Sequence, residues 1–273
     1  MTEIHFKYVN KVYGKNIDKA LILLEQGAKN EIVFKETGCQ VGLRNINLVI
    51  PSGKISCVMG LSGSGKSTLV RHINRLIEPS GGEVWAGDVN VTALSEKALR
   101  AFRQQQVSMV FQHFGLLPHL TVLQNVEYAL RVRRLPEAMQ REQAQHWLNE
   151  VGLSGYEASF PDQLSGGMRQ RVGLARALTA DTEIILMDEA FSALDPLIRT
   201  KLQDQLLTLQ SKLNKTIIFI THDINEAVKM GKHIAILNGG ELVQMGEVEE
   251  LVNHPANEYV AEFMQFVLDK GEE

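Results

Sequence analysis

The sequence is poor in cysteine and has no long apolar stretch. Its 273 residues include two cysteines, Cys39 and Cys57, which are too few for a disulfide framework and suit a reducing cytosol. No run of about 18 or more uncharged apolar residues is present, so we predict no helix that spans a bilayer by itself. The first residues also lack the basic and then apolar order of a secretory signal. We therefore expect a protein that stays where it is made, with both cysteines in its core.

An excess of basic residues is also missing. The 28 lysines and arginines are outnumbered by 32 aspartates and glutamates, which gives a net charge of −4. Nucleic-acid-binding domains usually carry a basic excess, so we expect no nucleic acid partner. A hydrophobic fraction of 44% with 22% charged residues is ordinary for a globular protein of one large domain, with or without an inserted subdomain.

Short apolar runs alternate with longer helical patterns, which predicts an α/β fold with a sheet covered by helices. Several of these runs are apolar almost throughout, as in strands that are buried on both faces. The predicted strands are Ile4 to Val9, Leu43 to Ile50, Ile55 to Met59, Val107 to Phe111, Ile184 to Asp188, Thr216 to Ile220 and His233 to Leu237.

Helical patterns interrupt the predicted sheet in two places. Residues 122–151 read as two helices broken near Leu135-Pro136, and no strand is predicted between Phe111 and Ile184. We therefore predict a helical subdomain at 113–165, inserted in a core domain formed by 1–112 and 166–273. A second helical insert is predicted at about 16–38.

The first candidate site follows the apolar run that ends at Met59. The segment matches the template G-x-x-x-x-G-K-[ST], and it stands between a predicted strand and a predicted helix, as the template requires. Glycines let successive backbone N–H groups point at phosphate oxygens, and the helix N-terminus adds a partial positive charge. We expect a nucleotide with Mg²⁺ here, with Lys66 on the β- and γ-phosphates and Ser67 as a magnesium ligand. The candidate residues are Gly60, Leu61, Ser62, Gly63, Ser64, Gly65, Lys66, Ser67 and Thr68.

A pair of carboxylates forms the second candidate site. Asp188 and Glu189 come at the end of the apolar run Ile184-Ile-Leu-Met, and open α/β sheets place their sites at the carboxyl ends of strands. We assign Asp188 to the metal and Glu189 to the attacking water, as a general base. An Asp-Glu pair alone is more often a turn than a site, so the assignment depends on the phosphate loop.

The third candidate site is Ser165-Gly166-Gly167, which opens a helical pattern. Bare N–H groups at a helix N-terminus form an anion site, although the segment could also be a helix cap with a flexible entry. Beside the other two sites, this segment resembles the signature motif of the ABC ATPases. The resemblance implies a P-loop NTPase fold with an ABC ATPase core and ATP as the nucleotide.

Further positions resemble functional residues of that family. Gln112 resembles the Q-loop glutamine, which contacts magnesium and responds to the permease, and His222 the switch histidine near the γ-phosphate. Asp195 closes Ser192-Ala193-Leu194-Asp195, which resembles the D-loop at the dimer interface. Tyr13 resembles the aromatic residue that stacks on adenine. Two alternatives remain open: Tyr13 as a partly buried aromatic at a strand end, and His222 as a core histidine.

The resemblance also implies partners. Two subunits form a homodimer in which Ser165 to Gly167 of one chain face the γ-phosphate held by the other. The dimer binds integral membrane permease subunits at the cytoplasmic face of the inner (plasma) membrane, as a peripheral protein. A periplasmic or extracellular substrate-binding protein completes the system.

Within the family, the chain is similar to the ATPases of osmoprotectant importers for glycine betaine, proline betaine and choline. The similarity lies in Gly60-Leu61-Ser62, in Met168 to Arg171 and in Asp188 to Arg199. Met168 stands where many ABC ATPases have glutamine, and we expect activity to survive because the contact there is made chiefly by backbone and serine. Many members of this group continue into CBS-type regulatory domains, which we do not expect here.

Two other classes remain as alternatives. A non-transport ABC ATPase of DNA repair or of the ribosome would carry long coiled coils or two cassettes. A monomeric P-loop kinase or GTPase would leave Ser165 to Gly167 and His222 unexplained. Loss of specific activity on dilution would distinguish a dimeric site from a monomeric one.

Overall fold

The protein has an α/β fold whose elements fall into two compact units. The computed structural model describes residues 2–112, 114–192 and 194–268. Residues 1–99 and 220–273 form unit 1, and residues 100–219 form unit 2. Unit 2 contains all of the segment 113–165, and its folding as a separate subdomain stays a prediction.

Unit 1 carries two groups of strands. Four strands pair in the order β2-β1-β4-β5, with β1 antiparallel to both of its neighbours. In the second group, β9 pairs in parallel with β3 and antiparallel with β10. The strands are β1 (Ile4–Tyr13), β2 (Gln40–Ile50), β3 (Ile55–Met59), β4 (Gly81–Ala86), β5 (Val89–Asn90), β9 (His233–Asn238) and β10 (Glu241–Glu247). The helices are α1 (Ile17–Glu25), α2 (Asn30–Thr37), α3 (Lys66–Ile73), α9 (Ile224–Met230), α10 (Val248–Asn253) and α11 (Glu258–Leu268), with a 3₁₀ turn η1 (Val91–Ala93).

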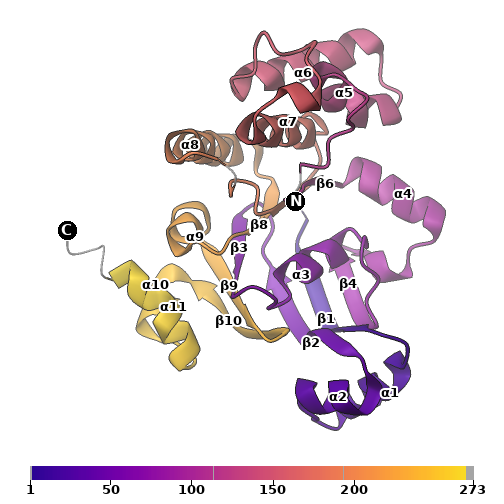
Figure 1. Ribbon diagram of the computed structural model, residues 1–273, viewed down its shortest axis with the longest axis vertical. Coiled ribbons are helices and arrows are strands. Elements are labelled where there is room, and N and C mark those ends of the chain that lie inside the picture. Colours follow the sequence, from indigo (N-terminus) through magenta and orange to yellow (C-terminus); the bar gives the residue numbers. More distant parts are fainter. Residues whose placement is uncertain (1, 113, 193, 269–273) are drawn as a thin grey trace. The chain divides into compact units, whose positions relative to one another are not determined.

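The short helices α1 and α2 close a small core against β1 (Figure 1). Ala20, Leu24 and Val33 are buried there with Val12 and Cys39. In α1 the buried residues Ala20 and Leu24 are four positions apart, as are Val33 and Thr37 in α2, so each helix buries one face. Both helices lie within the helical insert predicted at 16–38.

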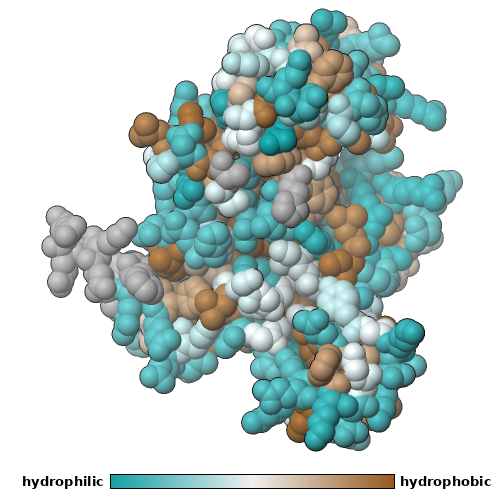
Figure 2. Space-filling model, in the orientation of Figure 1, coloured by the Kyte–Doolittle hydropathy of each residue, from teal (hydrophilic) through white to brown (hydrophobic). Residues whose placement is uncertain are grey.

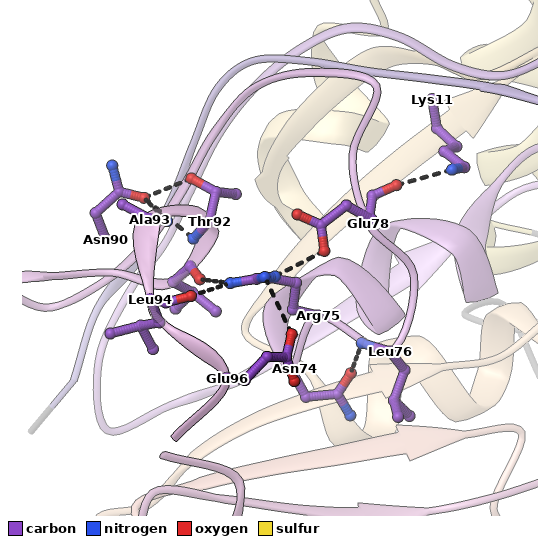
Figure 3. A network of polar contacts seen from close by, with 11 residues as sticks. Lys11, Asn74, Arg75, Leu76, Glu78, Asn90, Thr92, Ala93, Leu94 and Glu96 are labelled. Atoms are coloured by element: carbon purple, nitrogen blue, oxygen red, sulfur yellow. Dashed lines mark hydrogen bonds and ion pairs between the residues drawn. The ribbon is translucent and has the colours of Figure 1, made fainter. Parts of the chain in front are cut away.

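A polar network anchors the turn that follows α3 (Figure 3). The guanidinium of Arg75 donates to Glu78 at 2.7 Å and to the carbonyl oxygens of Val91 and Leu94 at 3.2 and 2.7 Å. Lys11 donates to the carbonyl oxygen of Glu78 at 2.8 Å. Because a guanidinium has five donors in a rigid plane, one side chain ties several backbone groups together. The network therefore fixes the C-terminal end of α3, whose N-terminal end carries the candidate phosphate loop.

Unit 2 combines a buried strand group with a cluster of helices. Its strands lie in the order β8-β7-β6, with β6 and β7 parallel, and all of their residues are buried. Helices α5, α6 and α7 pack on one another (Figure 1). The elements are β6 (Val107–Val110), α5 (Val122–Val132), α6 (Glu137–Glu150), η2 (Pro161–Gln163), α7 (Gly166–Thr179), β7 (Ile184–Asp188), α8 (Pro196–Leu213) and β8 (Thr216–Ile220). Helix α4 (Glu96–Gln105) contains the sequence boundary between the units, and the last residue of β8 lies past the second boundary.

The predicted strands are all present, β1 and β2 being longer than predicted, and the two helices predicted in 122–151 are α5 and α6. Three strands were not predicted: β4, β5 and β10. Only Val84 and Ala86 are buried in β4, and only Gly246 in β10. Strands with so few buried residues lack the apolar alternation that identifies a strand in sequence.

The surface, the helices and the cysteines match what the composition of the sequence predicts. On the face drawn in Figure 2, hydrophobic residues lie among hydrophilic ones in small groups. Among the helices of the described residues, none has the length and apolar character needed to cross a membrane. Cys39 and Cys57 are free and buried, as predicted, and burial raises the pKa of the Cys57 thiol.

Candidate functional site

The phosphate loop connects β3 to α3 in unit 1. Two of its positions need glycine, because a Cβ atom would collide with neighbouring backbone and because the backbone φ angle is positive. Gly60 has φ 144°, and a Cβ there would overlap the carbonyl oxygen of Leu237. Gly65 has φ 99°, and a Cβ there would lie 2.6 Å from the carbonyl oxygen of Gly42. Only glycine fits both conditions. The loop is therefore held closely against neighbouring backbone.

Lys66 and the start of α3 form a cationic end to this loop. The Lys66 side chain is buried, and its Nζ donates to the carbonyl oxygens of Gly60 and Leu61, each at 2.9 Å. Gly65 precedes the helix without a side-chain cap, and the first turn of α3 has no acidic residue. The N–H groups of a helix N-terminus, the helix dipole and an ammonium together fit the phosphates of a nucleotide.

Tyr13 ends β1 beside this loop. Its hydroxyl lies 3.3 Å from Thr68 Oγ1, and its side chain is 40% exposed. Lys11 Nζ lies 5.0 Å from the centroid of the ring. A ring that is open on part of its surface can stack on a base, so this placement is compatible with the predicted contact to adenine.

His222 follows β8 at the surface of unit 1, which is not the position of a core histidine. The residue before it, Thr221, is buried and donates to Glu226 at 2.6 Å, while accepting from the backbone N–H of Asp223 at 3.0 Å. These bonds fix the backbone on both sides of His222. The histidine is thus presented from an anchored turn.

In unit 2, two strand ends bring a glutamine to a carboxylate. Gln112 follows β6, and its Nε2 donates to Oε2 of Glu189 at 3.0 Å. Asp188 ends β7 with its side chain fully buried. Since β6 and β7 are parallel neighbours, their carboxyl ends meet at one edge of the sheet. The three residues predicted at these strand ends therefore lie at the same edge.

Ser165 and Asp195 both cap helices. Ser165 precedes α7 and accepts from the N–H of Met168 at 3.3 Å, and Asp195 precedes α8 and accepts from Ile198 at 3.0 Å. Both side chains are exposed, and Gly166 and Gly167 follow as the first residues of α7. A cap satisfies one N–H of the first turn and leaves the others for an anion. The cap and the anion site proposed from sequence are thus compatible readings of Ser165.

Helix α7 also holds the segment that follows Gln112. Arg176 donates to the carbonyl oxygens of Phe114 and Gly115 at 3.2 and 2.7 Å, and burial lowers its pKa. The guanidinium of Arg169 lies 5.1 Å from the centroid of the Phe114 ring, within the range of a cation–π contact. Two predicted segments include a residue outside the described part of the chain, His113 and Ala193.

The structure adds contacts for two residues to which the sequence assigned no role of their own. The Tyr259 hydroxyl, on α11, accepts from the N–H of Leu61 at 3.4 Å and donates to the carbonyl oxygen of Leu237 at 3.3 Å. Gln170, on α7, donates to the carbonyl oxygen of Glu189 at 3.2 Å. No spacing signals either contact, because each joins residues that only folding brings together.

Comparison with known proteins shows the family of the chain. A family model described as ABC transporter matches residues 43–192. The glycine betaine/carnitine transport ATP-binding protein GbuA of Listeria monocytogenes is 50% identical over 267 residues, which are 98% of this chain and 67% of that protein. The glycine betaine/proline betaine transport system ATP-binding protein ProV of Escherichia coli is 48% identical over 97% of this chain and 66% of its own length. The chain thus spans about two thirds of the length of these relatives.

A solved structure supports the fold. The ATP-binding cassette MJ0796, as a dimer in a post-hydrolysis state bound to ADP and phosphate, superposes with a TM-score of 0.77 at 33% identity. The match covers 89% of this chain and 98% of that one. The predicted α/β fold of an ABC ATPase is confirmed, and the chain belongs to the ABC transporter family of ATP-binding proteins.

Proposed function

We propose that this protein binds and hydrolyses ATP as the energy-supplying subunit of an ABC importer. The observation that carries the proposal is the hydrogen bond of 3.0 Å between Gln112 and Glu189 at the carboxyl ends of β6 and β7. It joins the residue that responds to the membrane partner in this family to the carboxylate proposed to activate water. The phosphate loop supplies the nucleotide-binding part of the same activity.

Each polar side chain has a role that its position supports. Lys66 and the N–H groups of the loop hold the phosphates, and His222 contacts the γ-phosphate. Ser67, Gln112 and Asp188 hold Mg²⁺, which neutralises charge on the phosphate oxygens. Ser67 is the second residue of α3, directly after Lys66, and Ser67, Gln112 and Asp188 all offer the oxygen ligands that this ion prefers.

Glu189 acts as the general base. It takes a proton from the water that attacks the γ-phosphate, while Gln112 fixes one of its carboxylate oxygens. An oriented base loses less freedom at the moment of reaction, so the hydrogen bond raises the rate rather than the affinity for ATP.

Two subunits complete the sites between them. Ser165, Gly166 and Gly167 of one chain bind the γ-phosphate held by the other, and Asp195 lies at the interface. The exposure of Ser165 and Asp195, each at a helix N-terminus, supports this role. Because ATP then joins the two chains, loss of the γ-phosphate opens the dimer, a population shift that a membrane partner can use.

The permease docks beside the Q-loop, at the apolar segment between Phe114 and Leu120. Asn125 is fully buried and shapes this segment: its Oδ1 accepts from the N–H of Leu117 at 2.8 Å, and its Nδ2 donates to the carbonyl oxygens of Leu117 and Leu120 at 3.0 Å. An apolar turn held from within can receive a short helix from a partner. The protein is then peripheral, on the cytoplasmic face of the membrane, with a separate binding protein delivering the cargo.

The cargo is a quaternary ammonium compound such as glycine betaine, proline betaine or choline. The support is the identity to relatives named for glycine betaine transport. The nucleotide-binding subunit does not touch the cargo, so the assignment is tested by purifying the complex with its binding protein. The compounds that the binding protein retains should carry a quaternary ammonium group.

The test of the ATPase is Glu189→Gln, which keeps the shape of the side chain and removes the base. We expect kcat to fall by about 10²–10⁴, the range typical of a general base, with ATP binding retained. Glu183→Gln is the matched control, because Glu183 precedes the other end of the same strand, β7, and is exposed.

The same variant tests the dimer. In size-exclusion chromatography with ATP and Mg²⁺, Glu189→Gln should elute as a stable dimer and the unmodified chain mainly as a monomer. A variant that binds ATP tightly and stays monomeric would contradict the proposed sites shared between two chains.

A further inference from the structure

Glu189 adopts a backbone conformation that few residues tolerate. Its φ is 49°, in the left-handed region, which is disfavoured for residues other than glycine. Glycine would relieve this conformation but would remove the carboxylate. The surrounding structure must therefore stabilise Glu189 in this conformation, as at other strained functional positions.

Three hydrogen bonds to the carbonyl oxygen of Glu189 hold its peptide group in place. The oxygen accepts from the backbone N–H of Ser192 at 3.2 Å, from the Ser192 hydroxyl at 2.9 Å and from Nε2 of Gln170 at 3.2 Å. The two bonds from Ser192 are local and close a turn. The bond from Gln170 comes from another element, so it ties the peptide of Glu189 to α7.

The side chain of Gln170 is buried, and within the part of the chain that the structure describes only one end of its amide is hydrogen-bonded. Its side chain is 2% exposed, and its Oε1 is buried without a hydrogen-bond partner among the described residues. A buried acceptor without a hydrogen-bond partner lowers the stability of the fold. Another interaction of the glutamine must therefore offset this cost. An apolar side chain of the same length would fill the space without that penalty. The hydrogen bond from Gln170 Nε2 to the carbonyl oxygen of Glu189 is the interaction that can offset it.

Gln170 also lies in the second turn of the helix that Ser165 caps. A movement of the first turn of α7 therefore reaches the Glu189 peptide through one side chain. Arg176, two turns further along, holds the segment after Gln112. Helix α7 thus contacts Glu189 directly, and it contacts the segment that begins two residues after Gln112.

We propose that Gln170 is a positioning residue that couples the two nucleotide sites of the dimer. When the partner's nucleotide engages Ser165, α7 carries Gln170 and sets the peptide of Glu189, which orients the carboxylate toward the nucleotide of its own subunit. The proposal rests on the proposed function, since it requires Glu189 to be the base and Ser165 to meet the partner's ATP.

The test replaces Gln170 by methionine in the full chain, which keeps length and volume and removes the donor. We expect kcat to fall about five- to tenfold, as for the loss of one hydrogen bond, while the Kd for ATP stays within about twofold. The Hill coefficient for ATP should fall toward one, because the coupling between the sites is lost. A merely structural role would not change the Hill coefficient while leaving ATP binding intact.

Gln140→Met is the matched control. Gln140 is also a buried helical glutamine of unit 2, and its Nε2 donates to the carbonyl oxygen of Leu135 at 2.6 Å. Both variants lose one buried hydrogen bond, but only Gln170→Met should lower kcat and the Hill coefficient. If Gln170→Met does not fold, Gln170→Asn, whose amide is one methylene shorter, replaces it with the same expectations.

The outcomes separate this proposal from the proposed function. A kcat for Gln170→Met within about twofold of the unmodified chain, or an equal loss in Gln140→Met, would overturn the coupling role. If Gln170 acts through Glu189, adding Gln170→Met to Glu189→Gln should lower the residual rate by less than about twofold, and a full additive loss would overturn it. Normal hydrolysis by Glu189→Gln alone would instead reject the assignment of the base.

Discussion

His72 should make the stability of unit 1 depend on pH. It lies on α3, fully buried, with Nδ1 at 2.6 Å from the carbonyl oxygen of Thr68. A carbonyl oxygen only accepts, so Nδ1 carries the proton and donates. The other nitrogen, Nε2, is buried and has no hydrogen-bond partner within the described residues. Charging the ring would place a proton there without an acceptor.

The pKa of His72 is accordingly lowered from 6.5 to about 4. Burial is the main cause; the hydrogen bond to Thr68 and the charge of Glu78 raise the pKa, and the charge of Lys11 lowers it. Between these two pKa values the unfolded chain binds more protons than the folded one, so stability falls as pH falls through this window. The difference corresponds to about 2 kcal/mol of unfolding free energy lost between about pH 7 and about pH 5.

The assay is urea denaturation of the full chain at several pH values in this range, for the unmodified protein and for His72→Asn. Asparagine can still donate to Thr68 but does not titrate, so the variant should lose about 2 kcal/mol less on acidification. Its absolute stability falls at every pH because the smaller side chain leaves a cavity, and the comparison therefore uses slopes. His146→Asn, at an exposed position of α6, is the control and should keep the original slope. Equal slopes for His72→Asn and the unmodified protein would refute the assignment.

Three further predictions concern binding. Tyr259→Phe removes the hydroxyl that joins the phosphate loop to β9 and should weaken ATP binding about fivefold, the effect of one hydrogen bond; unchanged affinity in calorimetry would mean that the contact does not support the loop. Tyr13→Ala should lower the affinity for ATP by a stacking contribution of about 1–3 kcal/mol without changing the binding of inorganic triphosphate, and an equal loss for both ligands would indicate a structural role. Leu117→Glu should leave ATP hydrolysis by the free subunit intact and reduce co-purification with the permease; normal assembly and transport would argue against docking at this segment, and loss of folding would assign Leu117 to the core.

Local patterns in the chain predicted most of the fold. Strands such as Ile184–Asp188, which is apolar up to its last residue and buried throughout, could be recognised without their neighbours. The helix break at Leu135-Pro136 was equally local, since proline cannot continue the preceding helix. The strands β4 and β10 bury few residues, and they exist because β1 and β9 offer them edges to pair with. Pairing of that kind depends on the fold and leaves little trace in the sequence.

The sequence by itself determined the family and which contiguous segments carry the chemistry that we propose. Gly60 to Thr68 and Ser165 to Gly167 are contiguous segments, in which the order of residues specifies both the turn and the groups that it presents. Only the tertiary structure decided which residues from distant parts of the chain contact these segments and the Glu189 peptide. The bond of Gln170 to the left-handed Glu189 depends on the packing of α7 against the strand group of unit 2, and the contact of Tyr259 with Leu61 joins residues far apart in the chain. A sequence pattern records which residues are neighbours along the chain, whereas strain and long-range hydrogen bonds arise from how folded elements approach one another.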